Sequence, residues 1–423
     1  MYVSRVSLVN FRNYAALHVS LPPGLILLQG DNAQGKSNFL EAVYYLATSR
    51  SPRTNSDAEI IGPSGQDHLT GITRISAEVR RDGDGTSLEI VLAGARSTVV
   101  SPRASGLNDH RSTAVRKQIR VNGVNRRALD LLGALRVVLF RPEDLDLVIG
   151  PPAGRRRALD ILLSQMDPAY PRALQRYNRV LLQRNHLLRR IANGDAGKEE
   201  LPVWDEPLAR HGSAILAQRQ QAVRRIAQLA AGAYRQISAP SRGNTAAWAG
   251  FPKTHPAPGS SEELSITYVS GIEGDTEEDF LARIGEVRRR DLFLGQTTVG
   301  PHRDDLEFRI GGMAAASFAS RGQQRSAVLA WKQAEGAYLR EQTGEDPVLL
   351  LDDVLSELDS QRQRAVIGTA KEYQQVILTT TGGGLGTVML EPAARFTVTG
   401  GRLSLGPPVG GESPPETGKD IGP

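Results

Sequence analysis

The chain has 423 residues, 40% of them hydrophobic and 23% charged, with a formal net charge of +5. This length predicts two to three domains at about 150 residues each, and this composition excludes a wholly disordered chain. The absence of cysteine excludes disulfide frameworks, thiolate zinc sites and cysteine nucleophiles; with no signal-peptide pattern and no long apolar run, it leads us to expect a cytoplasmic protein.

The first 50 residues predict the order strand, strand, loop, helix. Tyr2–Val9 alternates as a strand does, Leu25–Leu28 is a short apolar run typical of a buried strand, and a helical pattern runs from Lys36 to about Thr48. Further β-like stretches then predict an antiparallel sheet added to this first unit; they lie at residues 71–79, 88–92, 119–121 and 137–140.

The middle of the chain predicts a helical hairpin. Apolar residues recur at helical spacing from Tyr170 to Ile191 and again from Leu208 to Ala233, across a connection that contains glycine and proline. The pattern leaves open whether the hairpin projects as an arm or forms an ordinary helical subdomain. Residues 239–261 predict a loop, and the tail after Leu405 predicts disorder.

The last third returns to an α/β pattern, with helices expected at residues 322–340 and 360–372 and strands at 348–351 and 376–380. We expect these strands to share one sheet with the early ones, so that the helical region is an insertion. The predicted division is a first head segment at 1–150, an inserted helical lobe at 151–295, a second head segment at 296–405 and a disordered tail at 406–423.

A phosphate-binding loop stands between the early apolar strand and its helix. The sequence Gly30-Asp31-Asn32-Ala33-Gln34-Gly35-Lys36-Ser37 fits G-x-x-x-x-G-K-[ST]. Backbone N–H groups of such a loop surround the phosphates of a nucleotide, and the helix dipole adds to their attraction. Lys36 is expected to reach the β- and γ-phosphates, and the Ser37 hydroxyl to ligate Mg²⁺. The cofactors predicted are therefore ATP and Mg²⁺.

A second element supports this reading. The apolar strand 348–351 ends in Asp352 and Asp353. A buried strand that delivers a carboxylate beside a P-loop is the Walker B arrangement, in which Asp352 would hold Mg²⁺ and Asp353 would act as general base for the attacking water.

A third motif, Ser320-Arg321-Gly322-Gln323, opens a predicted helix 32 residues before Asp352. Together with the P-loop, the Asp-Asp strand end and Ser356-Glu357-Leu358-Asp359, it resembles the motif set of ABC-type ATPases. The resemblance implies an ABC-type ATPase head of α/β class in which Ser320, Gly322 and Gln323 contact ATP bound to the opposite subunit, so that a homodimer closes on two ATPs. A serine at a helix N-terminus is suited to bind an anion.

The spacing narrows the family. Lys36 and Asp352 lie 316 residues apart, which resembles the SMC-like group with its large insertion. The chain has neither the length for long coiled coils nor the cysteines of a zinc hook, and its other segments are similar to the RecF family of DNA replication and repair proteins. These segments are Leu8–Tyr14, Ala47–Arg53, Phe140–Leu145, Gly150–Pro152, Arg155–Asp160 and Gly300–Asp305.

Three positions depart from the common ABC pattern. Asp353 stands where many ABC ATPases have glutamate, Thr379-Thr380-Thr381 stands where a switch histidine is usual, and Glu143 is the candidate replacement for the Q-loop glutamine. These departures are similar to those of the RecF family and imply slow hydrolysis, with ATP acting as a clamp more than as a fuel.

Positive charge is concentrated in two segments. Residues 111–127 hold six basic side chains and no acidic one, and residues 155–190 hold nine arginines against two aspartates. Such clustering favours a polyanionic partner, although a solvated helix face would have the same pattern. The candidate phosphate contacts are Arg111, Arg116, Lys117, Arg155, Arg156, Arg157, Arg176 and Arg184.

The family resemblance implies an ATP-dependent DNA-binding protein that binds single-stranded DNA and gap junctions. It also implies cooperation with RecR and RecO in loading RecA. The alternative is an ABC-type ATPase of a transport or protein-assembly system, which the insertion and the basic segments disfavour. A nuclease with an ABC-type head is a third reading, and the seven histidines form no H-x-H or H-E-x-x-H pattern that would support it.

Overall fold

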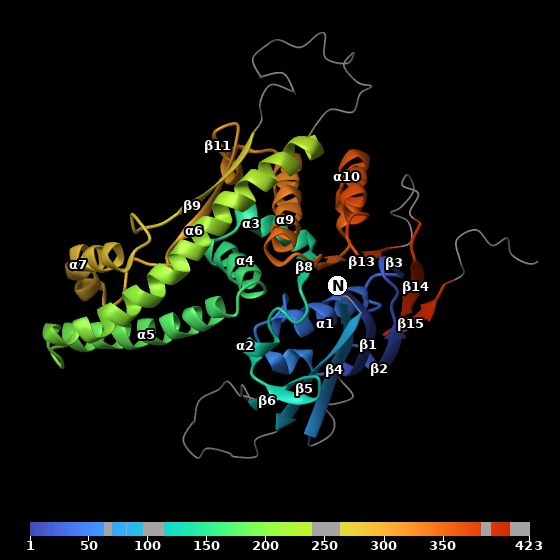
Figure 1. Cartoon of the computed structure of the whole chain (residues 1–423), viewed down its shortest axis with the longest axis horizontal. Coiled ribbons are helices and arrows are strands. Elements are labelled where there is room, and N and C mark those ends of the chain that lie inside the picture. The colour runs from blue at the N-terminus through green and yellow to red at the C-terminus, as the bar shows by residue number, and fades with distance from the viewer. Residues whose placement is uncertain (63–69, 82, 96–113, 239–262, 382–390, 407–423) are drawn as a thin grey trace, which may run out of the picture.

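A computed structural model describes residues 1–62, 70–81, 83–95, 114–238, 263–381 and 391–406 (Figure 1). Within these ranges the chain forms two six-stranded sheets, one three-stranded sheet and the helices that cover them. The predicted loop at 239–261, the predicted disordered tail after residue 406 and the candidate contact Arg111 lie outside the described residues.

The strands are β1 (Tyr2–Phe11), β2 (Tyr14–Ser20), β3 (Gly24–Gln29), β4 (Thr70–Arg81), β5 (Asp84–Ala95), β6 (Ala114–Val121), β7 (Val124–Arg126), β8 (Val137–Phe140), β9 (Leu264–Val269), β10 (Asp305–Ile310), β11 (Met313–Ala314), β12 (Val348–Leu351), β13 (Gln375–Thr380), β14 (Ala394–Thr399) and β15 (Arg402–Leu405). The helices are α1 (Lys36–Thr48), α2 (Ala128–Leu131), α3 (Asp146–Ile149), α4 (Pro152–Ser164), α5 (Ala169–Ala192), α6 (Pro202–Ser238), α7 (Glu277–Leu294), α8 (Ala315–Phe318), α9 (Arg321–Thr343) and α10 (Ser360–Ala370). The predicted helix 36–48 and strand 348–351 match α1 and β12 residue for residue, whereas β2, α4, β9 and α7 were not predicted.

The central sheet has the strand order β15-β14-β3-β13-β12-β8. Strands β14, β3, β13, β12 and β8 pair in parallel, and β15 is antiparallel at one edge. The early strands β3 and β8 therefore enclose the late strands β13 and β12. This confirms that the first and last parts of the chain share one sheet.

Both faces of this sheet are buried, which explains why its strands are continuous apolar runs. Because side chains alternate along a strand, successive residues enter different cores. In β8, Val137 and Leu139 pack with α1, while Val138 and Phe140 pack on the opposite side with α9. The central sheet is thus the wall between the two large cores of the molecule.

On the α1 side lies the predicted antiparallel sheet, with strand order β2-β1-β4-β5-β6-β7. The prediction was wrong for residues 137–140, because β8 pairs in parallel with β12 at the edge of the central sheet. Helix α1 is buried along most of its length between the two sheets, with Phe39, Val43, Tyr45 and Leu46 fully enclosed. The end of α1 at Thr48 lies close to β6 and η1 (Asp57–Ile60). Lys117 on β6 donates a hydrogen bond to the carbonyl of Ser49 at 2.8 Å and forms an ion pair with Asp57 of η1 at 3.0 Å.

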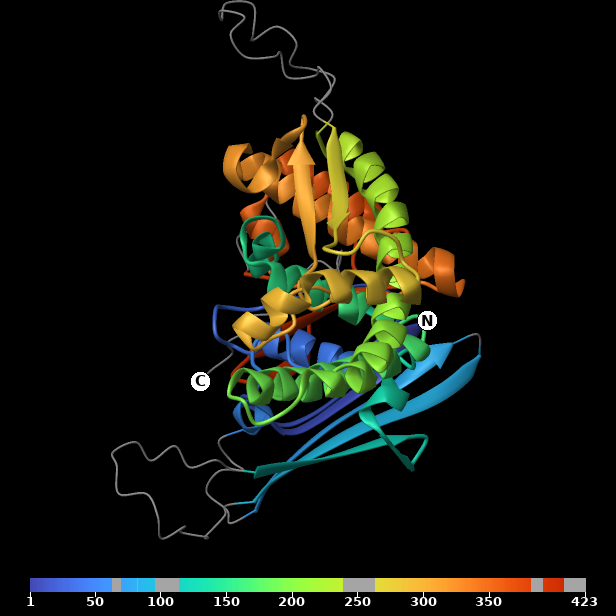
Figure 2. The ribbon, with the colours of Figure 1, turned by 90° about the vertical axis from the view of Figure 1, so that its left-hand side faces the viewer.

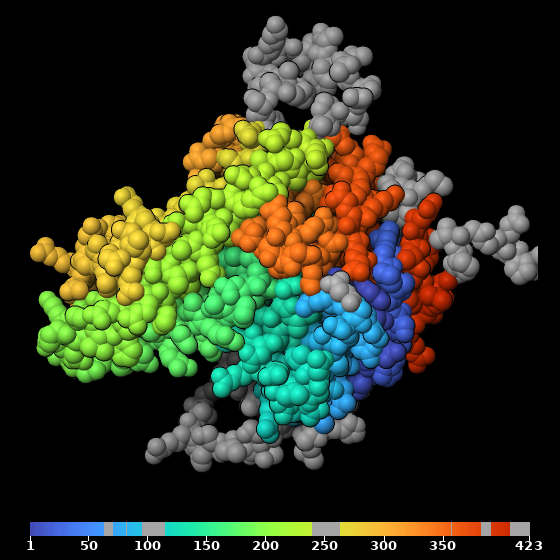
Figure 3. All heavy atoms as spheres, in the orientation of Figure 1, coloured from blue at the N-terminus to red at the C-terminus, as the bar shows by residue number. Residues whose placement is uncertain are grey.

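The predicted helical hairpin is formed by α5 and α6, joined by residues 193–201. Figures 1 and 3 show that this hairpin, with α7 beside it, extends away from the two six-stranded sheets as an arm. The arm is packed closely, because a methyl group at Gly212 of α6 would lie 2.4 Å from the ring of Phe280 on α7.

Above the arm, β9, β10 and β11 form the three-stranded sheet (Figure 2). Strand β9 pairs with β10 across residue 295, where the predicted helical lobe and second head segment meet. The four proposed ranges remain a prediction as a division into domains. None of the helices in the described part of the chain is long and apolar enough to cross a membrane.

Candidate functional site

The P-loop follows β3 and leads into α1, whose first residue is Lys36. The Lys36 ammonium donates hydrogen bonds to the carbonyls of Gly30 at 2.6 Å and Asp31 at 2.8 Å, so the side chain lies across the loop. Burial lowers the pKa of Lys36, and the nearby carboxylates of Asp353 and Asp352 partly oppose this shift. The lysine is therefore a cation held inside the loop that a phosphate would occupy.

The loop needs its two glycines for different reasons. A Cβ on Gly30 would lie 2.3 Å from the carbonyl oxygen of Val398, so β14 leaves no room for any side chain there. Gly35 has a φ of +118°, which side-chain-bearing residues rarely adopt, and a Cβ there would also meet Asn13 at 2.7 Å. Both positions explain the glycines of the motif by local geometry.

Residues from the first hairpin and the last strands hold the loop from outside. Asn13 donates to the carbonyl of Gln34 at 2.9 Å, and the Tyr14 hydroxyl donates to the carbonyl of Gly35 at 2.8 Å. The Gln34 side chain in turn accepts from the backbone N–H of Gly400 at 2.7 Å. The sequence segment Leu8–Tyr14 gave a family resemblance but not this supporting role, which depends on the tertiary structure.

The carboxyl ends of β3, β13 and β12 bring the two ATPase motifs together. The Ser37 hydroxyl donates to the Asp352 carboxylate at 2.7 Å, across 315 positions in the chain. Strand β13 lies between the other two, and its Thr379 hydroxyl donates to the same carboxylate oxygen at 3.0 Å. Burial raises the pKa of Asp352, and these two hydrogen bonds oppose the rise.

Asp353 adopts a left-handed backbone conformation with φ +49°, which is costly for a residue with a side chain. Its N–H donates to the Thr379 hydroxyl at 2.9 Å, and its carbonyl accepts from the Ser356 hydroxyl at 2.7 Å. Thr379 therefore contacts both acidic residues, donating to one and accepting from the other. The sequence marked this threonine only as an unusual residue at the switch position.

The Ser320 turn forms the N-terminus of α9. The Ser320 side chain accepts from the Gln323 N–H at 3.3 Å, and the Gln323 side chain accepts from the Ser320 N–H at 2.7 Å, which is a capping box. Gly322 lies beneath the guanidinium of Arg362, which would be 3.3 Å from a Cβ there. Ser320 is exposed on the surface, so its helix end is accessible to another molecule.

Glu143, the candidate Q-loop replacement, lies on a short helical turn (η3, Pro142–Leu145) after β8. Its side chain is exposed, and its negative charge contributes to the raised pKa of Asp352. The turn therefore places this carboxylate within electrostatic reach of the acidic strand end.

These residues fit a nucleotide with a hard divalent cation. The loop offers backbone N–H groups at the start of a helix and a cation to phosphates. Ser37 and Asp352 offer a hydroxyl and a carboxylate oxygen, which are ligand types that Mg²⁺ prefers. In the described ranges no group of three or more histidine or acidic side chains is arranged to hold a metal ion.

Two of the predicted DNA contacts are wrong, because the structure buries them in ion pairs. Arg184 is completely buried and bridges Asp205 and Asp291, each at 2.7 Å. Arg155 is 8% exposed and holds both carboxylate oxygens of Asp305, at 2.6 and 2.8 Å. Both arginines stabilise the helical lobe and have no free face for a phosphate.

The remaining described candidates lie at the surface to different degrees. Arg116 and Arg176 are exposed, while Lys117, Arg156 and Arg157 are half-buried. The last three line a cleft between the end of α1 and helices α4 and α5. The structure thus brings part of the two basic segments together, although they are about 40 residues apart in the sequence.

A family model described as "RecF/RecN/SMC N terminal domain" matches residues 2–399. The "DNA replication and repair protein RecF" of Herpetosiphon aurantiacus is 41% identical over 90% of this chain and 93% of its own, and that of Chloroflexus aggregans is 40% identical over 96% and 100%.

A solved structure of "the recombination mediator protein RecF-ATP in RecFOR pathway" superposes with a TM-score of 0.77 and 28% identity, covering 96% of this chain and 97% of the other. The similarity therefore extends over both head segments and the inserted lobe.

Proposed function

Because the chain belongs to the RecF family of DNA replication and repair proteins, we propose that it is an ATP-dependent DNA-binding switch of replication and recombinational repair. The observation that carries this proposal is the 2.7 Å hydrogen bond between Ser37 of the P-loop and Asp352 of the Walker B strand. This bond supports an ABC-type ATP site, because it joins the P-loop to the Walker B strand although 315 positions in the chain separate the two residues.

In the proposed site, the residues from Gly30 to Ser37 bind the phosphates of ATP, and Ser37 and Asp352 hold Mg²⁺. Bound Mg²⁺–ATP would supply a phosphoanhydride bond, and cleavage of this bond would end the ATP-bound state. Lys36 would bind the β- and γ-phosphates in place of its two carbonyl partners, and Asp353 would orient the attacking water as general base. Thr379 holds Asp352 and the Asp353 backbone, in the place where a histidine would supply a further donor.

Hydrolysis in this arrangement is expected to be slow. Asp353 has a shorter side chain than the usual glutamate, and the Thr379 hydroxyl is already occupied by the two acidic residues. With weak, DNA-stimulated ATPase activity, the rate of hydrolysis would set how long the ATP-bound, closed state of the protein lasts.

That closed state is a homodimer in which Ser320, Gly322 and Gln323 of one subunit reach the ATP of the other. The exposed capping box of Ser320 supports this role, because a helix N-terminus with an accessible hydroxyl suits the γ-phosphate. The Ser356 hydroxyl connects the segment Ser356–Asp359 to the backbone of Asp353, so that a partner pressing on this segment would act on the site.

DNA is proposed to lie along the candidate basic residues that are exposed or half-buried, which are Arg116, Lys117, Arg156, Arg157 and Arg176. Contacts of this kind go to phosphates and position the protein without reading sequence. The favoured substrates are single-stranded DNA and gap junctions. RecR and RecO are the proposed partners, with RecA loaded as the result.

The decisive experiment measures dimerisation by light scattering with and without Mg²⁺–ATP and gapped DNA. Wild type is expected to dimerise with ATP and more strongly with DNA, whereas Lys36→Ala is expected to remain monomeric. A wild type that stays monomeric under all conditions would refute the clamp.

DNA contact is tested separately by fluorescence anisotropy at several salt concentrations. The variant Arg116→Gln/Arg176→Gln should weaken binding to gapped DNA and lower the salt slope by about two, one for each lost phosphate contact. The control is Arg309→Gln, an exposed arginine on β10 paired with Glu307 at 2.8 Å. Equal slopes in all three proteins would exclude these arginines, and absent DNA binding by wild type would favour a transport or assembly ATPase.

A further inference from the structure

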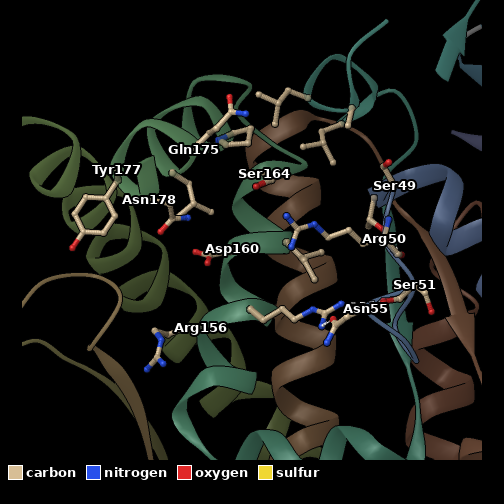
Figure 4. A pocket seen from close by; sticks show the side chains of 18 of the residues that line it. Ser49, Arg50, Ser51, Asn55, Arg156, Asp160, Ser164, Gln175, Tyr177 and Asn178 are labelled. Carbon is tan, nitrogen blue, oxygen red and sulfur yellow. Dashed lines mark hydrogen bonds between the residues drawn. The ribbon is translucent and has the colours of Figure 1, made fainter. Parts of the chain in front are cut away.

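A cleft of about 800 Å³ lies at the far end of α1 from the P-loop. Residues 48–57, Lys117 and the segment from Ala128 to Leu132 form one wall, and helices α4 and α5 form the other (Figure 4). Helix α1 has 13 residues, so its two ends are about 20 Å apart. The cleft is therefore separate from the ATP site.

The charges of the lining do not balance. Five lining side chains are cationic (Arg50, Lys117, Arg156, Arg157 and Arg219) and two are acidic (Asp57 and Asp160). Both acids are already paired, Asp57 with Lys117 at 3.0 Å and Asp160 with Arg219 at 2.6 Å. Three guanidinium groups remain, and within the described ranges none of them has a carboxylate at ion-pair distance.

The partners of two of these guanidinium groups are neutral oxygens. Arg156 donates to the backbone carbonyl of Asp304 at 2.8 Å. Arg157 donates to the carbonyl of Ser51 at 3.0 Å and to the Asn55 side chain at 2.9 Å. A guanidinium has five N–H donors, so both residues keep donors for a further acceptor. Arg50 is exposed and extends from the end of α1 toward α4 (Figure 4).

The cleft thus holds excess positive charge in a partly enclosed place. Burial lowers the pKa of Arg156 and the positive charge of Arg219 lowers it further, while the nearby carboxylates of Asp305, Asp160 and Asp304 oppose the shift only in part. His302 also lines the cleft and adds no charge at neutral pH, because burial lowers its pKa to about 4. An anion bound within the cleft would relieve this repulsion, and the planar fork of arginine suits the oxygens of a phosphate.

The rest of the lining indicates more than a bare anion. Leu129, Leu132, Ile161 and Leu174 give apolar surface next to the arginines. The amide side chains of Asn55, Gln175 and Asn178 also face the cleft (Figure 4). Apolar walls with a few convergent polar groups are typical of small-ligand pockets, and this volume lies within their usual range of about 300–1,000 Å³.

We propose that this cleft binds one nucleotide unit, with its phosphate on Arg157 at the Ser51 and Asn55 side and its sugar and base against the apolar wall. Arg156, the preceding residue of α4, is turned toward the carbonyl of Asp304 and adds positive charge to the cleft without sharing that phosphate (Figure 4). The phosphate has two sources with the same chemistry: a free nucleoside phosphate or one nucleotide of a DNA strand. The strand source rests on the proposed DNA-binding function, and the free source does not.

The test uses the full-length chain carrying Lys36→Ala, which removes phosphate binding at the P-loop. Thymidine 5′-monophosphate is titrated by calorimetry, and fluorescein-labelled dT10 by anisotropy. In this background, Arg156→Gln/Arg157→Gln should weaken the binding of one or both ligands by about tenfold or more, because the phosphate loses its charge-assisted hydrogen bonds from Arg157 and the cleft loses a second positive charge. Arg309→Gln is the matched control and should change either affinity by less than about twofold.

A second variant keeps the result decisive if the double substitution harms folding. Asn178→Trp fills the cleft from an exposed position of α5 and leaves every cation in place. If these variants weaken the binding of thymidine monophosphate, the phosphate of the cleft comes from a free nucleotide. If they weaken the binding of dT10 alone, it comes from a DNA strand. Unchanged binding of both ligands in Asn178→Trp and in a folded double variant overturns the proposal. If wild type binds no DNA but the monophosphate still binds in the cleft, only the proposed DNA function fails.

Discussion

The substitution Arg184→Ala separates a structural arginine from a DNA-binding one. Arg184 is fully buried in the arm, where it donates to Asp205, Asp291 and the Thr297 hydroxyl at 2.7–2.8 Å. Its removal leaves Asp291, which is itself fully buried, without its arginine, and reduces the pairing of Asp205 to Arg288 at 3.0 Å. A buried ion pair broken on one side costs about 3–5 kcal/mol.

That cost corresponds to a change of roughly two to three and a half orders of magnitude in the unfolding equilibrium of the arm. Urea unfolding followed by tryptophan fluorescence reports on this region, because Trp204 packs against the small cluster of Leu187, Leu188 and Leu201 beside Arg184. The expected result is an earlier transition of the arm in Arg184→Ala. Below this transition, DNA affinity per folded molecule should be close to that of wild type.

The control is Arg176→Ala, two turns earlier on the same helix α5 and exposed. Its stability should change by no more than about 0.5 kcal/mol, while its DNA affinity should fall. If Arg184→Ala unfolds at the same urea concentration as Arg176→Ala, the assignment of Arg184 to the core of the arm is refuted.

Three further predictions follow, two on the ATP site and one on a histidine of the cleft at the end of α1. Thr379→Val removes the hydroxyl that contacts Asp352 and Asp353, so calorimetry should show an affinity for Mg²⁺–ATP that is lower by about tenfold. Thr379→Ser should bind Mg²⁺–ATP as wild type does, and wild-type affinity in the valine variant would exclude a role of this hydroxyl in nucleotide binding. Gly30→Ala puts a methyl group 2.3 Å from the Val398 carbonyl oxygen and should abolish nucleotide binding. Gly285→Ala in α7 adds a methyl group that meets nothing within 4 Å, so nucleotide binding should stay intact, and nucleotide binding by Gly30→Ala would contradict the steric argument. The pKa of His302 is about 4 in the folded protein against 6.5 in a model peptide, so the unfolded chain binds the proton more readily, and the free energy of unfolding should fall by up to about 3 kcal/mol as the pH decreases from about 6.5 to 4. His302→Gln should flatten this part of the pH–stability curve, and an unchanged slope would exclude this histidine as the cause.

The sequence alone determined the features that are local in the chain. A loop of the form G-x-x-x-x-G-K-[ST] needs only eight consecutive residues, so the P-loop could be identified without the fold. The helix Lys36–Thr48 and the strand Val348–Leu351 followed from short apolar patterns, because a strand buried on both faces is apolar throughout. The family resemblance rested in the same way on contiguous segments.

Only the tertiary structure decided which charged residues are free. Arg176 and Arg184 lie two turns apart on one helix, yet the first faces solvent and the second lies between aspartates 21 and 107 positions away. A charge count treats them alike, because burial depends on helices that arrive later in the chain. Thr379 shows the same limit, since its contact with Asp352 exists only because β13 lies beside β12 in the sheet. The cleft at the end of α1 likewise joins residues from six separate parts of the chain, which no local pattern could place together.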